Sequence, residues 1–267
     1  MIYDKYNMDI DKNIFLAKRT LVDSIYQQAN LEGIAVTYAQ TQDILNNVNV
    51  NNLSPNEISK VCCLRDGWKY LFENINSSLD IVFLENLHEI VARFDVDYRY
   101  LGKLRQEQVL ISGTTWKPGI PDFDSIENLI NCCDYSSVTE KAIVTGLRLM
   151  RIQPFQDGNK RIGSYVINKI LIQKGKGIFN VPVELDGIFK TMLVEFYESN
   201  DCIDLANWIY DNCLIGVDEV QADETISSES RRSVRDKIKE ITNDSSSSVV
   251  NNIGTGIDSG WDSGIDD

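Results

Sequence analysis

Residues 153–164 read QPFQDGNKRIGS, and this stretch decides the fold of the 267-residue chain. Its first half predicts a turn, because Pro154 fixes its own φ, Gly158 admits a positive φ, and Asp and Asn side chains can hydrogen-bond the neighbouring backbone. Apolar residues then recur at helical spacing. A helix from about Asn159 to Gly175 is therefore predicted directly after the turn.

The start of this helix has the features of an anion-binding site. A glycine turn that leads into a helix leaves backbone N–H groups unpaired at the positive end of the helix dipole, and phosphate binds at such points. Lys160 and Arg161 add positive charge in the first turn, where Asp or Glu is usual. The pattern predicts phosphate binding by Gly158, Asn159, Lys160 and Arg161. A solvated helix start without a ligand is the alternative.

The stretch resembles the signature of the Fic (Fido) family, which reads His-Pro-Phe-x-Asp/Glu-Gly-Asn-Gly/Lys-Arg-x-x-Arg. Two positions differ, since Gln153 stands where the family has His and Ser164 where it often has a second Arg. The run also resembles that of bacterial Fic-like proteins that have Gln at this position. Seven residues match the family signature in register: Pro154, Phe155, Asp157, Gly158, Asn159, Lys160 and Arg161.

The resemblance implies a role for each of these positions. In Fic enzymes the His removes a proton from a target hydroxyl, which then attacks the α-phosphate of ATP. Asp157 would hold Mg²⁺, which prefers carboxylate oxygens, and Arg161 would clamp the outer phosphates with its planar guanidinium. Gln153 has no proton affinity near neutral pH, so general-base catalysis worth about 10²–10⁴-fold is lost. A glutamine can still orient a hydroxyl or a water by hydrogen bonding.

The rest of the chain predicts a predominantly α fold. A capping box at Ser54 and Glu57, with Pro55 between them, starts one of the helices. The resemblance implies a Fido-type helical bundle over residues 9–217, after an N-terminal extension of residues 1–8. Apolar residues at helical spacing predict further helices at residues 14–30, 37–45, 55–74, 79–94, 124–133, 138–150, 185–199 and 202–214.

Residues 106–121 carry the strand signal of the chain. Two short alternating runs separated by a Ser-Gly pair predict a small β-hairpin, which must lean on helices because two strands alone are weakly stable. In Fic proteins a hairpin after Gly-x-x-Arg, which ends here at Arg105, is a flap over the active site. An unknown target protein would dock on its edge by strand addition, and an inert surface hairpin is the alternative. The docking residues would be Ile111, Ser112, Gly113 and Thr114.

Residues 21–33 form the end of an N-terminal helix, and Gly33 suits a helix C-cap. Many Fic proteins carry Ser/Thr-x-x-x-Glu-Gly in such a helix, and its Glu blocks productive ATP binding. Glu32 matches this pattern, while Gln28 occupies the Ser/Thr position and the Arg that usually pairs with the Glu is Ser164. The resemblance implies autoinhibition by Glu32, and an ordinary remnant of the family sequence is the alternative.

Composition narrows the class of protein. A net charge of −14 argues against nucleic acid as a partner. There is no apolar run of about 18 residues and no apolar leader, which predicts a cytoplasmic protein without membrane contact. The six cysteines lack metal-ligand spacing, so reduced thiols and no zinc site are expected. The single histidine, His88, lies on a predicted helix and is expected to be structural.

Residues 218–267 differ in composition from the rest. They hold 12 acidic and 5 basic residues, which is half of the excess negative charge. A short charged helix is predicted at residues 230–243, followed by serines and a Gly-Ile/Trp-Asp repeat that cannot bury enough surface to order itself. A largely disordered acidic tail is therefore expected. Ile257, Trp261 and Ile265 recur every four residues, so a docking peptide is the alternative.

Several functions remain open on these residues. The first is a protein that binds ATP with Mg²⁺ but has weak or lost adenylyltransferase (AMPylation) activity, because Gln153 replaces the His. The second is an active AMP- or phosphoryl-transferase that modifies a Ser, Thr or Tyr hydroxyl of a target protein. The third is a non-catalytic interaction module that acts through its flap and tail. An inactivated variant of an AMP-transferase, with His changed to Gln, would also have this sequence.

Overall fold

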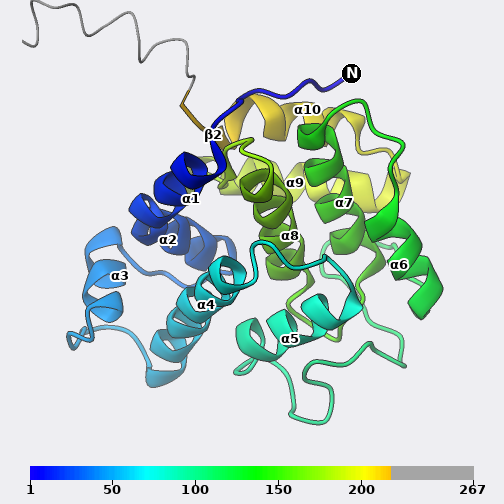
Figure 1. Cartoon of the computed structure of the whole chain (residues 1–267). Helices are drawn as coiled ribbons and strands as arrows, with labels where there is room; N and C mark the ends of the chain where they lie inside the picture. Colours follow the sequence, from blue (N-terminus) through cyan, green and yellow to red (C-terminus); the bar gives the residue numbers. More distant parts are fainter. Residues whose placement is uncertain (218–267) are drawn as a thin grey trace, which may run out of the picture. The chain divides into compact units, whose positions relative to one another are not determined.

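The computed structural model describes residues 1–217, which fold into ten α-helices, one 3₁₀ turn and one two-stranded sheet (Figure 1). The predominantly α fold is thereby confirmed. The predictions for the tail, residues 218–267, lie outside the described residues. The helices are α1 (Ile10–Arg19), α2 (Leu21–Leu31), α3 (Tyr38–Leu45), α4 (Pro55–Glu73), α5 (Ile81–Val91), α6 (Phe123–Asn131), α7 (Val138–Ile152), α8 (Asn159–Gln173), α9 (Asp186–Ser199) and α10 (Ile203–Asn212).

Helix α8 is the centre of the bundle. Thirteen of its fifteen residues are buried, because α7 lies along one side and α1, α4 and α5 contact the others (Figure 1). Several of its polar side chains bond backbone groups. The Lys169 ammonium donates to the carbonyls of Asn74 and Ser77, at 2.7 and 3.0 Å, just beyond the C-terminus of α4. The buried cation is thus bonded to carbonyls of the loop that follows α4.

Helices α7 and α8 approach each other through two glycines. A Cβ atom on Gly146 would lie 2.7 Å from the carbonyl oxygen of Gly163, and a Cβ on Gly163 would lie 2.7 Å from the carbonyl oxygen of Gly146. The missing side chains let the two backbones touch directly. This contact fixes the distance between the two helices that carry the signature turn.

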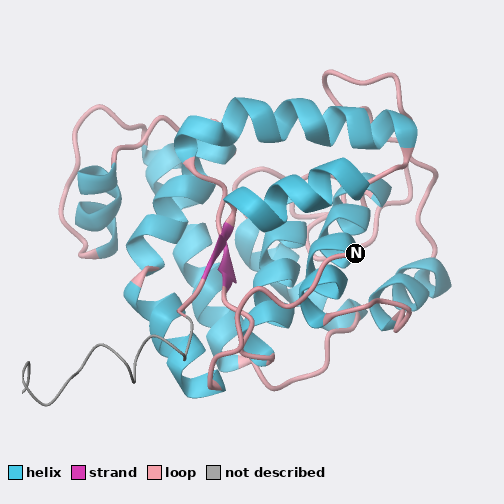
Figure 2. Cartoon of the chain, turned by 90° about the horizontal axis from the view of Figure 1, so that it is seen from above, coloured by secondary structure: helices cyan, strands magenta, loops and turns pink. Residues whose placement is uncertain are grey.

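The small sheet pairs residues that are distant in sequence. Strand β1 (Ile178–Phe179) is antiparallel to β2 (Leu214–Ile215), with Ile178 opposite Ile215 and Phe179 opposite Leu214 (Figure 2). The side chain of Asn168 on α8 holds β1, because it accepts from the N–H of Phe179 and donates to its carbonyl, at 2.8 and 2.9 Å. The sheet therefore ties the end of the described chain to the central helix.

Residues 106–121 are not a paired hairpin, which corrects the sequence prediction. They form an extended loop with a turn at residues 112–113 and without strand pairing. Pro118 and Pro121 lack the N–H that a ladder needs. Other groups take the backbone acceptors, since the guanidinium of Arg105 binds the carbonyls of both Glu107 and Gly119. The two arms of the flap are thus held together at their base by one side chain.

The first predicted helix is also corrected. Residues 14–30 belong to two helices, α1 and α2, that meet at Thr20. The Thr20 hydroxyl donates to the carbonyl of Leu16 at 3.0 Å. Side-chain bonds of this kind compete with the helix ladder and bend it. The capping box of α4 is present as predicted, with Ser54 and Glu57 bonded to each other's backbone.

Residues 1–8 pack against the bundle. The N–H of Met8 donates to the carbonyl of Gly175 at 2.7 Å, and the Asp4 carboxylate accepts from the N–H of Thr139 at 2.9 Å. Ile2 is buried. Within residues 1–217, none of the helices combines the length and the apolar character needed to cross a bilayer.

We predict that Gly163→Ala destabilises the fold by roughly 1–3 kcal/mol or more, because the new methyl group would push α7 away from α8. Gly187→Ala is the matched control. A Cβ there meets nothing within 4 Å, and in helix α9 alanine should be neutral or stabilise by up to about 1 kcal/mol. Urea denaturation of both variants measures the difference. Equal stability of the two variants would contradict the close glycine contact.

Candidate functional site

The loop between α7 and α8 is closed by the side chain of Asn159. Its Oδ1 accepts from the N–H of Phe155, and its Nδ2 donates to the Phe155 carbonyl, both at 2.9 Å. The same Nδ2 donates to Oε1 of Gln153 at 2.8 Å. Both amide hydrogens are therefore used inside the loop. Only the backbone N–H of Asn159 remains for the phosphate binding that the sequence predicts.

Gln153 ends α7 in a left-handed conformation, with φ 51° and ψ 67°. Pro154 follows and cannot continue the helix. A left-handed backbone is uncommon for a residue with a side chain, and such residues gather at functional sites. The Gln153 amide also donates from Nε2 to the carbonyl of Met150 at 2.5 Å. The side chain is therefore bonded at both of its polar atoms.

His88 supports the loop from beneath. Its ring stacks on Phe155 at 4.1 Å with an interplanar angle of 6°. The N–H of Gly102 donates to Nδ1 at 2.9 Å, so Nε2 carries the proton and donates to the carbonyl of Asp157 at 3.1 Å. Burial lowers the pKa of His88 to about 4, which keeps the ring neutral. The histidine is structural, as expected from its place on a helix.

A cavity of about 550 Å³ borders the loop and the first turn of α8. Its walls come from the signature, from Glu32 after α2, from residues 109–112 of the flap and from one face of α9. Arg161, Gly113 and Thr114 do not line it. The structure brings together eight of the residues predicted for the site: Glu32, Ile111, Ser112, Gln153, Asp157, Gly158, Asn159 and Lys160.

The N-terminus of α8 faces this cavity without a side-chain cap. The residue before the helix is Gly158, with φ 77°, and no side chain bonds the first-turn N–H groups. These groups have no acceptor inside the helix. The Asp157 carboxylate accepts from the N–H of Gly158 at 2.6 Å through one oxygen. Donors, dipole and one carboxylate are therefore gathered at the same spot.

Glu32 lies against the two cations of the signature. One of its oxygens is 3.4 Å from Nζ of Lys160, and the other is 3.2 Å from Nε of Arg161. Arg161 is buried and also bonds Asp95. Burial lowers the pKa of Arg161, but the carboxylates of Glu32 and Asp95 outweigh it and raise that pKa above its ordinary value. Arg161 is thus a fixed cation at the edge of the site.

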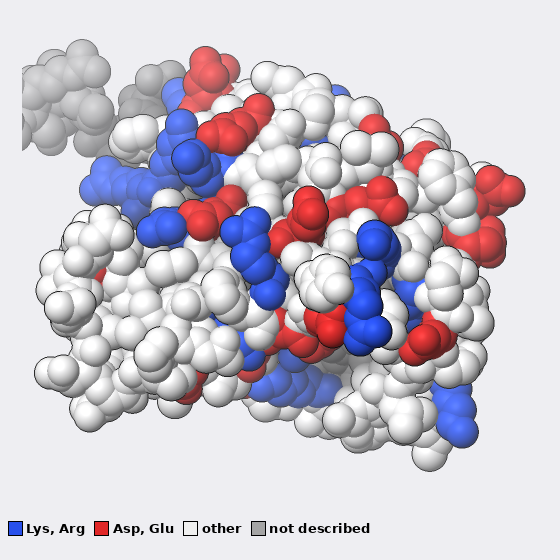
Figure 3. All heavy atoms as spheres, turned by 90° about the horizontal axis from the view of Figure 1, so that it is seen from below, with Lys and Arg blue, Asp and Glu red and all other residues white. Residues whose placement is uncertain are grey.

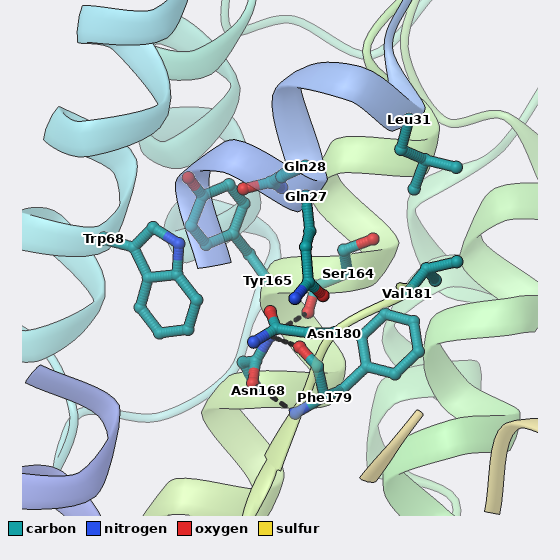
Figure 4. Close-up of a pocket in the computed structure, with 10 residues that line it drawn as sticks. All are labelled: Gln27, Gln28, Leu31, Trp68, Ser164, Tyr165, Asn168, Phe179, Asn180 and Val181. Atoms are coloured by element: carbon teal, nitrogen blue, oxygen red, sulfur yellow. Dashed lines mark hydrogen bonds between the residues drawn. The ribbon is translucent and has the colours of Figure 1, made fainter. Parts of the chain in front are cut away.

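Ser164 stands where the Fic family often has its second Arg. The side of α8 that faces α2 therefore has no cation at this position. The Ser164 hydroxyl donates to the carbonyl of Lys160 at 2.9 Å, and its side chain faces α2 (Figure 4). A cavity of about 20 Å³ lies there, bordered by Gln27, Gln28 and Trp68. The Gln27 oxygen and the Trp68 indole N–H have no protein partner, so the space suits one water molecule. Glu32 can therefore pair only with the cations on its other side.

The residues could hold Mg²⁺ only together with a phosphate ligand. Among residues 1–217, no cluster of three or more His, Cys, Asp or Glu could hold a metal ion. Asp157 is a single carboxylate, with one oxygen bonded to the Gly158 N–H. Mg²⁺ is commonly held by one or two carboxylates together with phosphate oxygens and waters. The donor set at Asp157 fits this type of coordination.

Comparison with known families agrees with this geometry. Residues 78–171, from the segment before α5 into α8, match the model of the Fic/DOC family. The chain contains a Fic domain. Solved structures show the same fold: a Fic domain protein from Bacteroides thetaiotaomicron superposes with a TM-score of 0.63 at 19% identity, covering 76% of this chain and 86% of that one. A Fic-1 fragment from C. elegans gives 0.64 at 19% identity, covering 74% and 62%.

Curated relatives are similar over part of their length. The protein adenylyltransferase Fic of Aedes aegypti is 27% identical over 167 residues, and that of Drosophila willistoni is 29% identical over 168 residues. Each match covers 59% of this chain and 33% of the relative. The chain therefore spans about a third of the length of the curated relatives that it matches.

The flap of this Fic domain is anchored by residues that the sequence did not single out for that role. Arg105 is fully buried and donates to the carbonyls of Gln153 and Ile152 as well as to both arms of the flap. Near the tip, the Glu198 carboxylate on α9 accepts from Thr115 N–H at 2.6 Å and from the Thr114 hydroxyl. Thr114 is thus bonded to α9 instead of facing the cavity. Arg105 thus bonds both the flap and the signature loop.

Helix α9 supplies the wall of the cavity that sequence analysis missed. Four of its residues line the cavity at helical spacing, and this spacing was the available signal. Tyr197 lies beside the signature, and its hydroxyl hydrogen-bonds the Gln153 side chain. Burial, with the Glu32 charge, raises the pKa of Tyr197 far above its ordinary value, so the phenol stays neutral. The four residues are Lys190, Leu193, Val194 and Tyr197.

We predict that His88 makes the Fic domain sensitive to acid. The folded-state pKa is about 4 and the ordinary value is 6.5, so the unfolded chain binds the proton more readily. This contribution to stability is complete above pH 6.5 and is lost as the pH falls towards 4, by roughly 3 kcal/mol in total. Urea denaturation of the wild type and of His88→Gln at several pH values measures it. Parallel pH profiles of the two proteins would contradict the prediction.

Proposed function

We propose that this Fic domain binds ATP with Mg²⁺ in the 550 Å³ cavity and has weak or lost protein adenylyltransferase activity. The observation that carries the proposal is the uncapped N-terminus of α8, which opens on the cavity beside Lys160. Free N–H groups, the helix dipole and a fixed cation together favour a phosphate group. Mg²⁺ at Asp157 would neutralise charge on the phosphate oxygens.

The state of Gln153 supports the loss of activity. Its Nε2 donates to the Met150 carbonyl and its Oε1 accepts from Asn159, so the amide closes the loop rather than facing a substrate hydroxyl. The residues that line the cavity include no histidine. The single histidine of the chain is His88, whose two ring nitrogens are bonded beneath the loop. Tyr197 stays protonated.

Glu32 supports a second part of the proposal, which is autoinhibition. Its carboxylate pairs with the cationic side chains of Lys160 and Arg161, to which a phosphate would also bind. An anionic ligand must therefore displace Glu32 or share these cations with it. Removal of the Glu32 charge should strengthen binding of the nucleotide.

Charge on the surface gives little support for nucleic acid as the partner. On the face shown in Figure 3, much of the surface is uncharged, and acidic side chains lie near many of the basic ones. A nucleic-acid site needs a broad basic area. The relatives named protein adenylyltransferases instead favour a nucleotide and a protein target. The flap, with Ile111 and Ser112 at the cavity, is the proposed place for that target.

Isothermal titration calorimetry with ATP and Mg²⁺ tests the binding. We expect saturable binding by the wild type, an affinity about tenfold lower for Lys160→Ala, and an affinity several-fold higher for Glu32→Gln, since each change alters one charge at the phosphate position. Lys69→Ala removes an exposed cation on α4 and is the matched control, with unchanged affinity. Absence of binding in every variant would leave only the protein-interaction function.

Label transfer from α-³²P-ATP to proteins of a lysate separates the weak or lost activity from an active transferase. We expect little or no transfer by the wild type and more by Gln153→His, because the histidine restores a general base. Strong transfer by the wild type would refute the proposed loss of activity.

A further inference from the structure

Arg161 is held from two sides by carboxylates of different character. On one side its Nη1 donates to the Asp95 carboxylate and to the carbonyl of Val91. On the other side its Nε lies 3.2 Å from Glu32. That second contact is an ion pair without hydrogen-bond geometry, because Nε of Arg161 has no hydrogen-bond partner. Asp95 is therefore the hydrogen-bonded partner of Arg161, and Glu32 is held by charge attraction alone.

Asp95 is itself fixed in place. It follows α5, and its N–H donates to the carbonyl of Ala92 at 2.9 Å. Its second carboxylate oxygen lies 2.5 Å from Nζ of Lys60 on α4. Burial raises the pKa of Asp95, but Arg161 and Lys60 outweigh it and lower that pKa below its ordinary value. Asp95 thus stays ionised between two cations.

Asp95 does not border the cavity proposed for the nucleotide. It lines a separate cavity of about 120 Å³ together with Lys60 and Arg161. The two cavities share Glu32 and Asp157 as lining residues, and Asp95 reaches this shared wall through its bond to Arg161, which contacts Glu32. The order of charges is Lys60, Asp95, Arg161, Glu32 and Lys160, with opposite signs next to each other.

We propose that Asp95, backed by Lys60, is the positioning residue of Arg161. It keeps the guanidinium in place, and paired with a carboxylate, when an incoming phosphate displaces Glu32. Without Asp95, the carboxylate left beside Arg161 is Glu32. Arg161 would then pair more strongly with this inhibitory residue, and Glu32 would compete with the phosphate for the guanidinium. This inference rests on the proposed function of the same site.

Calorimetry with two nucleotides tests the inference. Asp95→Asn keeps the shape and removes the charge, and it should weaken binding of ATP with Mg²⁺ about tenfold. Binding of AMP, which lacks the outer phosphates, should not change. Asp95→Glu should restore part of the ATP affinity. Asp66→Asn removes a more exposed carboxylate on α4 and is the matched control.

A double change gives a second measure of the same coupling. If Asp95 weakens the pairing of Arg161 with Glu32, then Glu32→Gln should raise the ATP affinity by a larger factor in the Asp95→Asn background than in the wild type. Equal factors would overturn the inference. So would an unchanged ATP affinity in Asp95→Asn, or an equal loss for ATP and AMP, which is the mark of general damage to the fold.

The free protein provides a test that needs no nucleotide. The Arg161 Nε–H signal in ¹⁵N NMR spectra, assigned by its loss in Arg161→Lys, should be sharp in the wild type and broadened or shifted in Asp95→Asn, but unchanged in Asp66→Asn. An unchanged signal in Asp95→Asn overturns the inference. A wild type that binds no ATP refutes the proposed function alone, and the NMR comparison then still decides whether Asp95 positions Arg161.

Discussion

The site depends on the closure of one short loop by Asn159. This side chain bonds both backbone groups of Phe155 and the side chain of Gln153, and so closes the six-residue connection between α7 and α8. Around it, the glycine contact fixes the two helices and His88 fills the space beneath. The loop can then present uncapped N–H groups to a cavity, because its own backbone is held by side chains instead of by a cap on α8.

The same closure accounts for both parts of the proposed function, the anion site and the missing base. The proposed phosphate binding uses the helix start and the cations, which the loop positions. Proton removal needs a free basic atom at residue 153, and Gln153 uses its polar atoms within the loop. Arg161 and Glu32 then set the charge that a ligand meets. The proposed function thus assigns binding and catalysis to different atoms of one turn.

Local patterns in the sequence predicted the parts of the molecule that local interactions decide. The signature turn, the helix after it and the Ser54 capping box depend on neighbours within a few positions. The flap was predicted as a hairpin from its alternation and its Ser-Gly pair, and it is instead shaped by Arg105 and Glu198. Such partners lie far away in the chain, and no spacing rule connects them. The break at Thr20 was missed because the apolar spacing continues through it.

Ion pairs between residues distant in sequence also limit how much of the site could be predicted from the sequence. The resemblance led to Asp157, Lys160, Arg161 and Glu32, and the structure places all four around the loop. Asp95 lies in an unremarkable loop after α5, and nothing in its surroundings in the sequence indicates a contact with Arg161. Packing of α5 beside α8 creates that contact. Charges buried between helices therefore need the fold before they can be assigned.

A crystal structure of the protein with ATP and Mg²⁺ tests the account most directly. The account predicts that the phosphates lie against the first-turn N–H groups of α8, that Glu32 has moved away from Lys160, and that the Gln153 amide remains bonded to Met150 and Asn159. Phosphates bound elsewhere in the cavity would contradict the anion site. A Gln153 side chain turned out towards the α-phosphate would contradict the claim that the loop withholds it from catalysis.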